Sequence, residues 1–167
     1  MTSIPPTTVC TLVFFLRDDE ILLAMKKRGF GEGLWNGVGG KIEPDETMEQ
    51  ALIRESQEEV GLTPIYWEKV AVHDFYMHEG STSPWHMQGH VFVCKQWEGE
   101  AVETEEMAPR WTKIKDIPYD KMWSDDIVWL PQMLMGKLLQ GTFHFDSKAE
   151  MTKANLEIVR TLSNSVQ

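Results

Sequence analysis

Hydrophobic positions along the chain gather into short runs that are separated by polar or glycine-rich segments. Val9–Leu16 and Ile21–Met25 are rich in strand-forming residues, and the acidic stretch 18–20 between them predicts a turn, so a β-hairpin is expected here. Three further strands are predicted over Lys69–Met77, Gly89–Trp97 and Arg110–Ile114. The tail segment Ala154–Leu162 is ambiguous between strand and helix, and its pattern slightly favours a strand.

One segment carries both the start and the stop signals of an α-helix. Thr47 followed three residues later by Gln50 predicts a capping box, in which each residue bonds the backbone of the other. Gly61 is a typical residue after a helix end, because glycine adopts the left-handed conformation at little cost. The sequence therefore predicts a helix over Thr47–Val60.

A second helix is expected over Ser124–Leu139, where a serine cap and two acidic residues suit the positive end of the helix dipole. Pro131 should kink this helix or mark its true start. Strands mixed with two helices predict an α/β fold in which helices pack on the faces of a mixed sheet. Because no linker or repeat divides the chain, we expect a single domain over residues 1–167, with residues 1–8 as a flexible leader.

Two loops stand out between the predicted elements. Six glycines fall between Arg28 and Gly40, a density that excludes a regular helix and favours a loop whose backbone approaches something closely. A polar segment with serine and proline is expected to form a second loop over His78–Trp85.

Composition narrows the class of protein. The chain has 167 residues, of which 42% are hydrophobic and 25% charged, as in ordinary globular proteins. Its apolar runs are too short to cross a bilayer and no secretory signal opens it, so a cytoplasmic location is expected. Cys10 and Cys94 suggest neither a disulfide framework nor a metal site. The net charge of −10 disfavours duplex nucleic acid, and an anionic ligand would need a cation between itself and the protein.

Three carboxylates share one face of the first predicted helix. At roughly 100° per residue, Glu55, Glu58 and Glu59 lie within about 100° of one another. Like charges at this spacing destabilise a helix, so the arrangement favours a hard divalent cation such as Mg²⁺ or Mn²⁺. A solvated acidic face is the alternative. The neighbouring flank can pack on a sheet and carries Leu52, Ile53, Ser56 and Val60.

The residues around this helix follow a longer pattern. Gly40, five residues, Glu46, seven residues and the run RESQEEVGL over 54–62 resemble the Nudix hydrolase signature, G-x5-E-x7-R-E-U-x-E-E-x-G-U, where U is aliphatic. Ser56 departs from the pattern, because the family has an aliphatic residue on this packing flank. We expect the departure to cost stability or local rigidity rather than to remove a ligand.

The resemblance implies a Nudix fold, an α/β/α sandwich with a mixed sheet, and hydrolysis of a nucleoside diphosphate linked to another moiety. It also implies that Arg54 orients the glutamates and that a glutamate or a metal-bound water deprotonates the attacking water. Glu55 is our choice for that base. Glu106 resembles a further metal ligand or an alternative base, and a solvated acidic turn is the other interpretation. The metal ligands that the resemblance implies inside the motif are Gly39, Glu55, Glu58 and Glu59.

Three stretches resemble one branch of the family, the MutT homologues that hydrolyse oxidised purine nucleoside triphosphates: Met25–Lys41, Glu105–Trp111 and Met122–Asp126. In that branch a tryptophan stacks on the base and two aspartates meet its Watson–Crick edge. Two neighbouring carboxyl groups do not both ionise, so one donates while the other accepts, and proton exchange would admit both oxidised guanine and oxidised adenine. A buried tryptophan beside a helix cap is the alternative. The residues matching this base pocket are Asn36, Trp123, Asp125 and Asp126.

Other positions match substrate-binding positions or candidate apolar walls of that branch, although each could be an ordinary core residue. The positions are Thr11, Lys26, Phe30, Val38, Gly39, Gly40 and Lys41, with Phe75, Met87 and Met107 as walls.

The expected function is a Mg²⁺-dependent pyrophosphohydrolase, a monomer that binds small nucleotides but neither duplex nucleic acid nor membranes. Two alternatives stay open, namely hydrolysis of methylated purine nucleotides, dinucleoside polyphosphates or RNA caps, and a catalytically silent nucleotide-binding module.

Overall fold

The computed structural model describes residues 7–162, and these residues fall into two compact units. We name each unit after its helix. The α1 unit contains residues 11–69 and 91–123, and the α2 unit contains residues 7–10, 70–90 and 124–162. No helix in residues 7–162 is long and apolar enough to cross a membrane.

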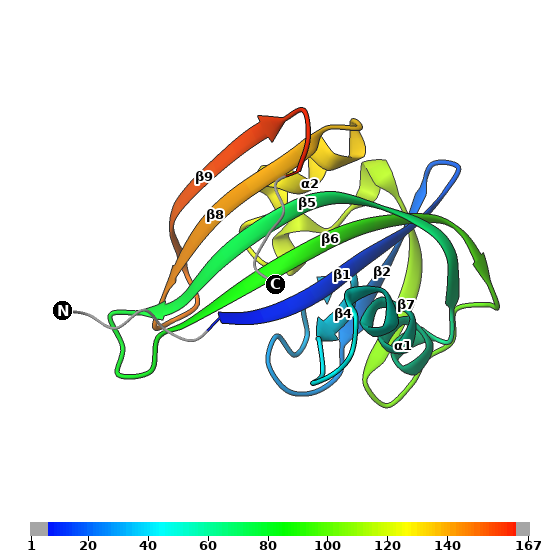
Figure 1. The fold of residues 1–167 in the computed structure, drawn as a ribbon, viewed down its shortest axis with the longest axis horizontal. Coiled ribbons are helices and arrows are strands. Elements are labelled where there is room, and N and C mark those ends of the chain that lie inside the picture. Colours follow the sequence, from blue (N-terminus) through cyan, green and yellow to red (C-terminus); the bar gives the residue numbers. More distant parts are fainter. Residues whose placement is uncertain (1–6, 163–167) are drawn as a thin grey trace. The chain divides into compact units, whose positions relative to one another are not determined.

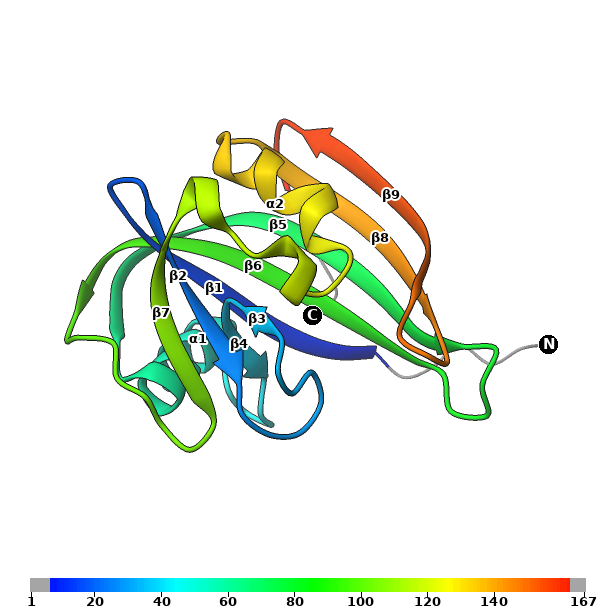
Figure 2. The ribbon, with the colours of Figure 1, turned by 180° about the vertical axis from the view of Figure 1, so that it is seen from behind.

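The α1 unit combines a sheet with the helix α1 (Met48–Val60), which lies beside β4 (Figure 1). Its sheet has the order β3-β2-β1-β6-β5, with β4 paired to β1 and β7 paired to β2 along its length (Figure 2). Two 3₁₀ turns, Ile114–Asp116 and Tyr119–Lys121, follow β7. The strands are β1 (Thr7–Arg17), β2 (Glu20–Lys26), β3 (Trp35–Asn36), β4 (Val38–Lys41), β5 (Thr63–Glu79), β6 (Trp85–Glu98) and β7 (Met107–Lys113), of which β1, β5 and β6 also contribute residues to the α2 unit.

The α2 unit adds α2 (Asp126–Leu134), β8 (Leu138–Asp146) and β9 (Met151–Val159) to its parts of the shared strands. Its strand order is β1-β6-β5-β8-β9. The β5–β8 pair is parallel, whereas β8 and β9 are antiparallel. The sheet is therefore mixed, and the expected α/β class with two helices is confirmed.

The N-terminal hairpin has the form that the sequence predicts. Strands β1 and β2 are antiparallel, with Leu16 opposite Ile21 and Arg17 opposite Glu20. Asp18 adopts a φ of 49° in the turn, a conformation that aspartate tolerates better than most residues. The hairpin supplies several residues to the core of the α1 unit, which consists of Val13, Phe15, Leu22, Ala24, Val38, Leu52, Val60, Leu62, Phe92, Cys94 and Met107.

Helix α1 also begins and ends as expected. The Thr47 side chain accepts a hydrogen bond from the backbone N–H of Gln50, and the Gln50 side chain accepts one from the N–H of Thr47. Gly61 follows the helix with a φ of 76° and donates its N–H to Gln57. Both ends of the helix are thus fixed by local sequence.

The second helix is shorter than the predicted span Ser124–Leu139. It ends at Leu134, Gly136 follows with a φ of 87°, and β8 starts at Leu138. Asp125 rather than Ser124 occupies the N-cap position, where no side chain caps the helix. Pro131 lies inside the helix without ending it. The apolar run that follows fits either element, and its parallel pairing with β5 decides for the strand.

The loop predicted over His78–Trp85 is also shorter than expected, because β5 continues to Glu79 and β6 begins at Trp85. Strand β6 buries three polar residues at alternate positions, namely His86, Gln88 and His90. The first part of the strand therefore lacks the alternation of hydrophobic and polar residues that would have predicted it. The predicted loop over Arg28–Gly40 likewise contains the short strands β3 and β4, and the predicted strand Arg110–Ile114 is β7, which begins at Met107.

The expected leader, residues 1–8, lies partly outside the described residues. Residues 7 and 8 already belong to β1, so the leader prediction is wrong for these two positions. The tail predicted as a strand over Ala154–Leu162 is β9 (Met151–Val159). A single domain over residues 1–167 stays a prediction.

Candidate active site

The glycine-rich segment approaches two neighbours so closely that side chains would not fit. A Cβ added at Gly39 would lie 1.8 Å from the carbonyl oxygen of Thr11 on β1. A Cβ at Gly40 would lie 2.6 Å from Oε1 of Glu55 on α1. The loop prediction of a close backbone approach is confirmed, and one of the neighbours is a carboxylate of the acidic helix.

Helix α1 packs through the flank that the sequence predicted. Leu52 and Val60 are buried in the core of the α1 unit, and Ile53 packs against that core. Ser56 is fully buried on the same flank, and its hydroxyl donates a hydrogen bond of 2.8 Å to the carbonyl oxygen of Leu52. A serine is accepted here because the preceding helical turn satisfies its hydroxyl.

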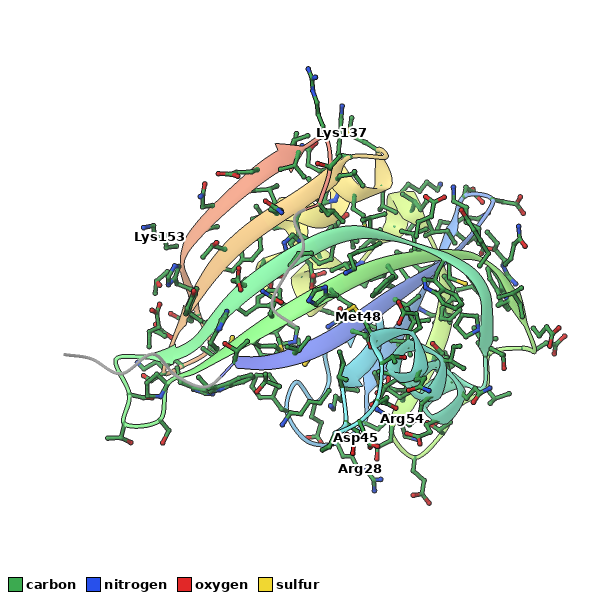
Figure 3. All side chains as sticks on the ribbon, in the orientation of Figure 1. Arg28, Asp45, Met48, Arg54, Lys137 and Lys153 are labelled. Atoms are coloured by element: carbon green, nitrogen blue, oxygen red, sulfur yellow. The ribbon has the colours of Figure 1, made fainter. Side chains whose placement is uncertain are left out.

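Arg54, a residue of α1 labelled in Figure 3, joins the acidic helix to the loop before it. Its guanidinium holds both carboxylate oxygens of Glu46, at 2.6 Å and 2.9 Å, and donates to the Lys41 carbonyl at 3.1 Å. It also donates to Glu55 at 2.9 Å and to Glu58 at 3.3 Å. Arg54 thus hydrogen-bonds to three acidic side chains at once and orients two of the predicted ligands.

Glu46 is a functional residue that our prediction of site residues missed, although it belongs to the motif. The Arg54 hydrogen bonds, with help from the backbone N–H of Glu43, lower the pKa of Glu46 to about 2. The same contacts raise the pKa of Arg54. A bidentate pair of this kind fixes the arginine in one orientation. Its position in the motif was the signal that could have identified Glu46.

Glu59 lies in the opposite environment. Burial, followed by the neighbouring charge of Glu55, raises the pKa of the Glu59 carboxyl to about 8, and the Gly39 N–H partly opposes the shift. Its Oε2 is buried and has no hydrogen-bond partner within residues 7–162. A buried carboxylate oxygen without a donor, beside a second carboxylate, is an environment that a cation would stabilise.

The predicted metal ligands therefore fit a divalent ion in their chemistry and their placement. Glu55, Glu58 and Glu59 project from one helix, Gly40 lies directly against Glu55, and Gly39 hydrogen-bonds to Glu59. Within the described part of the chain, however, no three acidic, histidine or cysteine side chains converge as a preformed metal site. Glu55 and Glu58 each bond to Arg54 through one carboxylate oxygen.

Glu106 lies in an acidic turn that is tied to both the helix and the glycine-rich segment. Arg28 pairs with Glu106 through two nitrogens, and this pairing lowers the pKa of Glu106. The hydroxyl of Thr104 donates to the carbonyl oxygen of Glu59 at 2.8 Å. Lys27 reinforces the turn through Glu103 at 2.6 Å. Arg28 therefore holds the Glu106 carboxylate, and the role of Glu106 as a metal ligand or base stays a prediction.

Other predicted substrate residues of the α1 unit divide into two groups. Lys26 lies close enough to Glu59 and Glu106 for its charge to lower the pKa of both. Lys41 is exposed and contacts Arg54 through its carbonyl oxygen. The other group is buried. Val38 and Met107 lie in the core of the α1 unit, and Thr11 is buried with a hydroxyl that has no hydrogen-bond partner in the described range.

An aromatic pair in the α1 unit brings two predicted base-binding residues together. The rings of Phe30 and Trp123 have centroids 5.0 Å apart, and a Cβ at Gly31 would lie 3.4 Å from the Trp123 indole nitrogen. Asn36 follows Trp35, which bridges to Met122, the residue before Trp123. The Asn36 side-chain oxygen accepts the N–H of Gly37 at 2.8 Å. The half-exposed Phe30 and Trp123 thus form an aromatic surface near Asn36.

The remaining predicted base-binding residues lie in the α2 unit. Asp125 and Asp126 are each 3% exposed at the start of α2. Burial raises the pKa of Asp125 to about 6, although a hydrogen bond from Trp129 opposes the shift. Phe75 on β5 stacks on Phe143 of β8 with centroids 5.5 Å apart, and Met87 is half-buried on β6.

Two residues of the α2 unit were not anticipated. Trp129 donates to Asp125, and its spacing of four residues on a helix was an available signal. His73 is fully buried, and neither of its ring nitrogens has a hydrogen-bond partner among residues 7–162. Burial lowers the pKa of His73 to about 3.

Comparisons with known proteins identify similar chains. The NUDIX domain matches residues 6–133. The oxidized purine nucleoside triphosphate hydrolase of Danio rerio is 43% identical over 152 residues, covering 91% of this chain and 96% of the relative. The protein of the same name from Mus musculus is 40% identical over 149 residues, covering 89% and 94%. A crystal structure of a MutT protein from Bacillus halodurans has a TM-score of 0.79 and 25% identity, covering 90% of this chain and 97% of that chain.

Proposed function

Because the chain belongs to the Nudix family, we propose that it hydrolyses oxidised purine nucleoside and deoxynucleoside triphosphates to a monophosphate and pyrophosphate. The observation that carries this proposal is the acidic helix, on which Arg54 contacts Glu46, Glu55 and Glu58 while Glu59 is partly buried beside Gly39. The names of the Danio rerio and Mus musculus relatives support the substrate class.

Nudix hydrolases generally use a divalent metal, and for this chain we propose Mg²⁺, with Mn²⁺ as a substitute. The residues that would hold the ion are Glu55, Glu58 and Glu59 with the Gly39 carbonyl, and Glu106 would join them once Arg28 releases it. A bound divalent ion supplies charge neutralisation of the phosphates and lowers the pKa of water. It also allows a chain with a net charge of −10 to bind a polyphosphate.

The chain's own residues prepare the attack on the phosphate. Glu55 lies 2.9 Å from Arg54, which holds one of its carboxylate oxygens in place, and a base must be held within reach of the proton that it takes. Lys26, close to Glu59 and Glu106, offers a positive charge to a phosphate oxygen. We propose Glu55 as the base and Arg54 as the residue that orients it.

For recognition of the base we propose Asn36, Trp123, Asp125 and Asp126. The Phe30–Trp123 surface can stack on a purine, which is worth roughly 1–3 kcal/mol per base. A carboxyl with a pKa of about 6 is close to the point where donor and acceptor forms exchange, so Asp125 can present either form near neutral pH. This exchange supports selection of both oxidised guanine and oxidised adenine.

A panel of nucleotides in the presence of Mg²⁺ tests the proposal. The products should be monophosphate and pyrophosphate, and kcat/KM should be highest for 8-oxo-dGTP or 2-hydroxy-dATP. Higher kcat/KM for unmodified, methylated, dinucleoside or cap substrates would contradict the proposed substrate class, although the protein would still act as a Nudix hydrolase. Tight nucleotide binding without any turnover would instead indicate a silent binding module.

The remaining expectations are tested separately. We propose that the protein is a monomer that does not bind duplex DNA, which light scattering and a DNA-binding titration can check. A cytoplasmic location stays a prediction, and cell fractionation would test it.

A further inference from the structure

The α2 unit contains a buried hydrogen bond between Trp129 and Asp125. The indole Nε1–H donates to Oδ2 of Asp125 over 2.7 Å. The two residues are four positions apart at the start of α2, with Trp129 fully buried and Asp125 only 3% exposed. A hydrogen bond to a buried carboxylate is strong, and its loss leaves a desolvated oxygen unpaired.

The chemistry of this bond makes the two oxygens of Asp125 different from each other. An indole N–H can donate but cannot accept, so Oδ2 must accept whether the carboxyl is ionised or protonated. Because a carbonyl oxygen accepts a hydrogen bond better than a carboxyl hydroxyl oxygen does, the indole bond favours a proton on Oδ1 over one on Oδ2. Protonation changes the hydrogen-bonding character of Oδ1 only, from acceptor to donor.

The indole ring is held in place by an aromatic cluster. His73 on β5 packs against the Trp129 ring with centroids 4.6 Å apart, and Phe143 on β8 lies edge-on to His73 at 5.2 Å. A Cβ at Gly141 would lie 2.5 Å from the Phe143 ring and 2.7 Å from Nδ1 of His73, so β8 needs a glycine here. Because the indole cannot rotate without displacing this cluster, the direction of its N–H is fixed.

We propose that Trp129 is a positioning residue for base selection. Its N–H occupies Oδ2 of Asp125, so that Oδ1 is the atom that forms the hydrogen bond to the base. The inference rests on the proposed function, in which Asp125 contacts the base. Guanine-type bases carry a keto acceptor where adenine-type bases carry an amino donor. A single oxygen that switches between donor and acceptor can serve both, provided that the carboxyl does not turn over.

A double-variant experiment tests this role. In Asp125→Asn the Trp129 N–H still requires an oxygen acceptor, so the amide NH₂ takes the place of Oδ1 as a permanent donor. We expect the ratio of kcat/KM for 8-oxo-dGTP to that for 2-hydroxy-dATP to change at least tenfold, mainly through KM. Adding Trp129→Phe keeps a ring against His73 but removes the N–H, so the amide can turn over and the ratio should return at least threefold towards the wild-type value.

The outcomes distinguish the positioning role of Trp129 from base recognition by Asp125. An unchanged ratio in Asp125→Asn would mean that Asp125 does not read the base, and the proposed base recognition would fail. A changed ratio that the added Trp129→Phe does not move would overturn the positioning role and leave base recognition intact. The matched control is Trp97→Phe, which alters a tryptophan of the α1 unit stacked on Trp111 and should leave the ratio unchanged.

A measurement that needs no Trp129 variant guards against misfolding. With ¹⁵N-labelled tryptophan, the Trp129 indole N–H should exchange slowly with solvent, and its resonance should shift in Asp125→Asn because the acceptor loses its charge. Fast exchange, or an indole resonance that Asp125→Asn leaves in place, would contradict the proposal.

Discussion

Glu46 and Glu59 are two glutamates of the same motif in opposite environments. Glu46 accepts two hydrogen bonds from Arg54, which lower the pKa of its carboxyl to about 2. Glu59 is partly buried beside Glu55, and its pKa is raised to about 8. One residue thus anchors the arginine, while the other has an oxygen that needs a proton or a cation.

The variant Glu59→Gln keeps the shape of the side chain but removes its charge. We expect kcat to fall by several powers of ten, because a neutral amide oxygen is a poor ligand for a hard divalent ion. Pyrophosphate release with saturating 8-oxo-dGTP and Mg²⁺ measures the effect. Glu49→Gln, an exposed residue in the first turn of α1, is the matched control and should retain turnover. Normal turnover in Glu59→Gln would remove the acidic helix from the mechanism.

At the scale of elements, the ligands depend on where α1 begins and ends. The capping box at Thr47 and the left-handed Gly61 fix both ends, while Thr104 ties the acidic turn to the carbonyl of Glu59. The close approach of Gly40 to Glu55 then places β4 against the helix, and the close approach of Gly39 to Thr11 places it against β1. The register between the helix, the glycine-rich segment and the acidic turn therefore rests on a few local contacts.

Replacing the cap by Thr47→Ala should lower the free energy of unfolding by about 1 kcal/mol, because the N–H of Gln50 loses its acceptor. Urea unfolding followed by circular dichroism measures this change. Thr47→Ser keeps the hydroxyl and should lose less than half as much. Equal losses in the two variants would show that the methyl group, not the cap, stabilises the helix.

At the scale of the whole molecule, folding buries groups that would otherwise bind protons. His73 has a pKa of about 3 when folded, whereas an unfolded histidine has a pKa of about 6.5. Between these values the unfolded chain binds the extra proton, so the contribution of His73 to stability rises with pH across the window from about 3 to 6.5. Asp125 acts in the opposite sense between about 4 and 6, because its folded pKa is raised.

The variant His73→Phe should therefore flatten the dependence of stability on pH. Between pH 4.5 and pH 7.5 the wild-type protein should gain about 2–3 kcal/mol more than the variant, since two pKa units correspond to this energy. Chemical unfolding of both proteins at the two pH values gives the difference. Parallel pH profiles would indicate that His73 is protonated or hydrated in the folded protein.

Metal binding is a second property of the whole chain, whose net charge is −10. Mg²⁺ should raise the Tm of the wild-type protein, by an amount equivalent to about 2.7 kcal/mol at a hundred times Kd, and chelation should abolish turnover. Glu59→Gln should show a much smaller increase in Tm at the same Mg²⁺ concentration. Equal increases in both proteins would place the ion elsewhere.

The sequence by itself determined the local elements and the catalytic motif. The hairpin and the limits of α1 follow from turn residues and caps, and these signals lie within a few residues of one another. The tail segment was ambiguous in sequence, and its pattern only slightly favoured the strand that the structure has. The spacing of Glu55, Glu58 and Glu59 on one helix face is equally local. Ser56 was correctly placed on the packing flank, where it is fully buried.

Only the tertiary structure decided what depends on distant partners. The apolar run that follows α2 forms β8 because it pairs with β5. At the start of β6, buried polar residues obscure the alternation of hydrophobic and polar positions that is typical of a strand. Likewise, Glu106 bonds to Arg28 and His73 is buried among aromatic rings. Spacing along the chain does not encode such contacts, since burial and pairing across many residues set their energies.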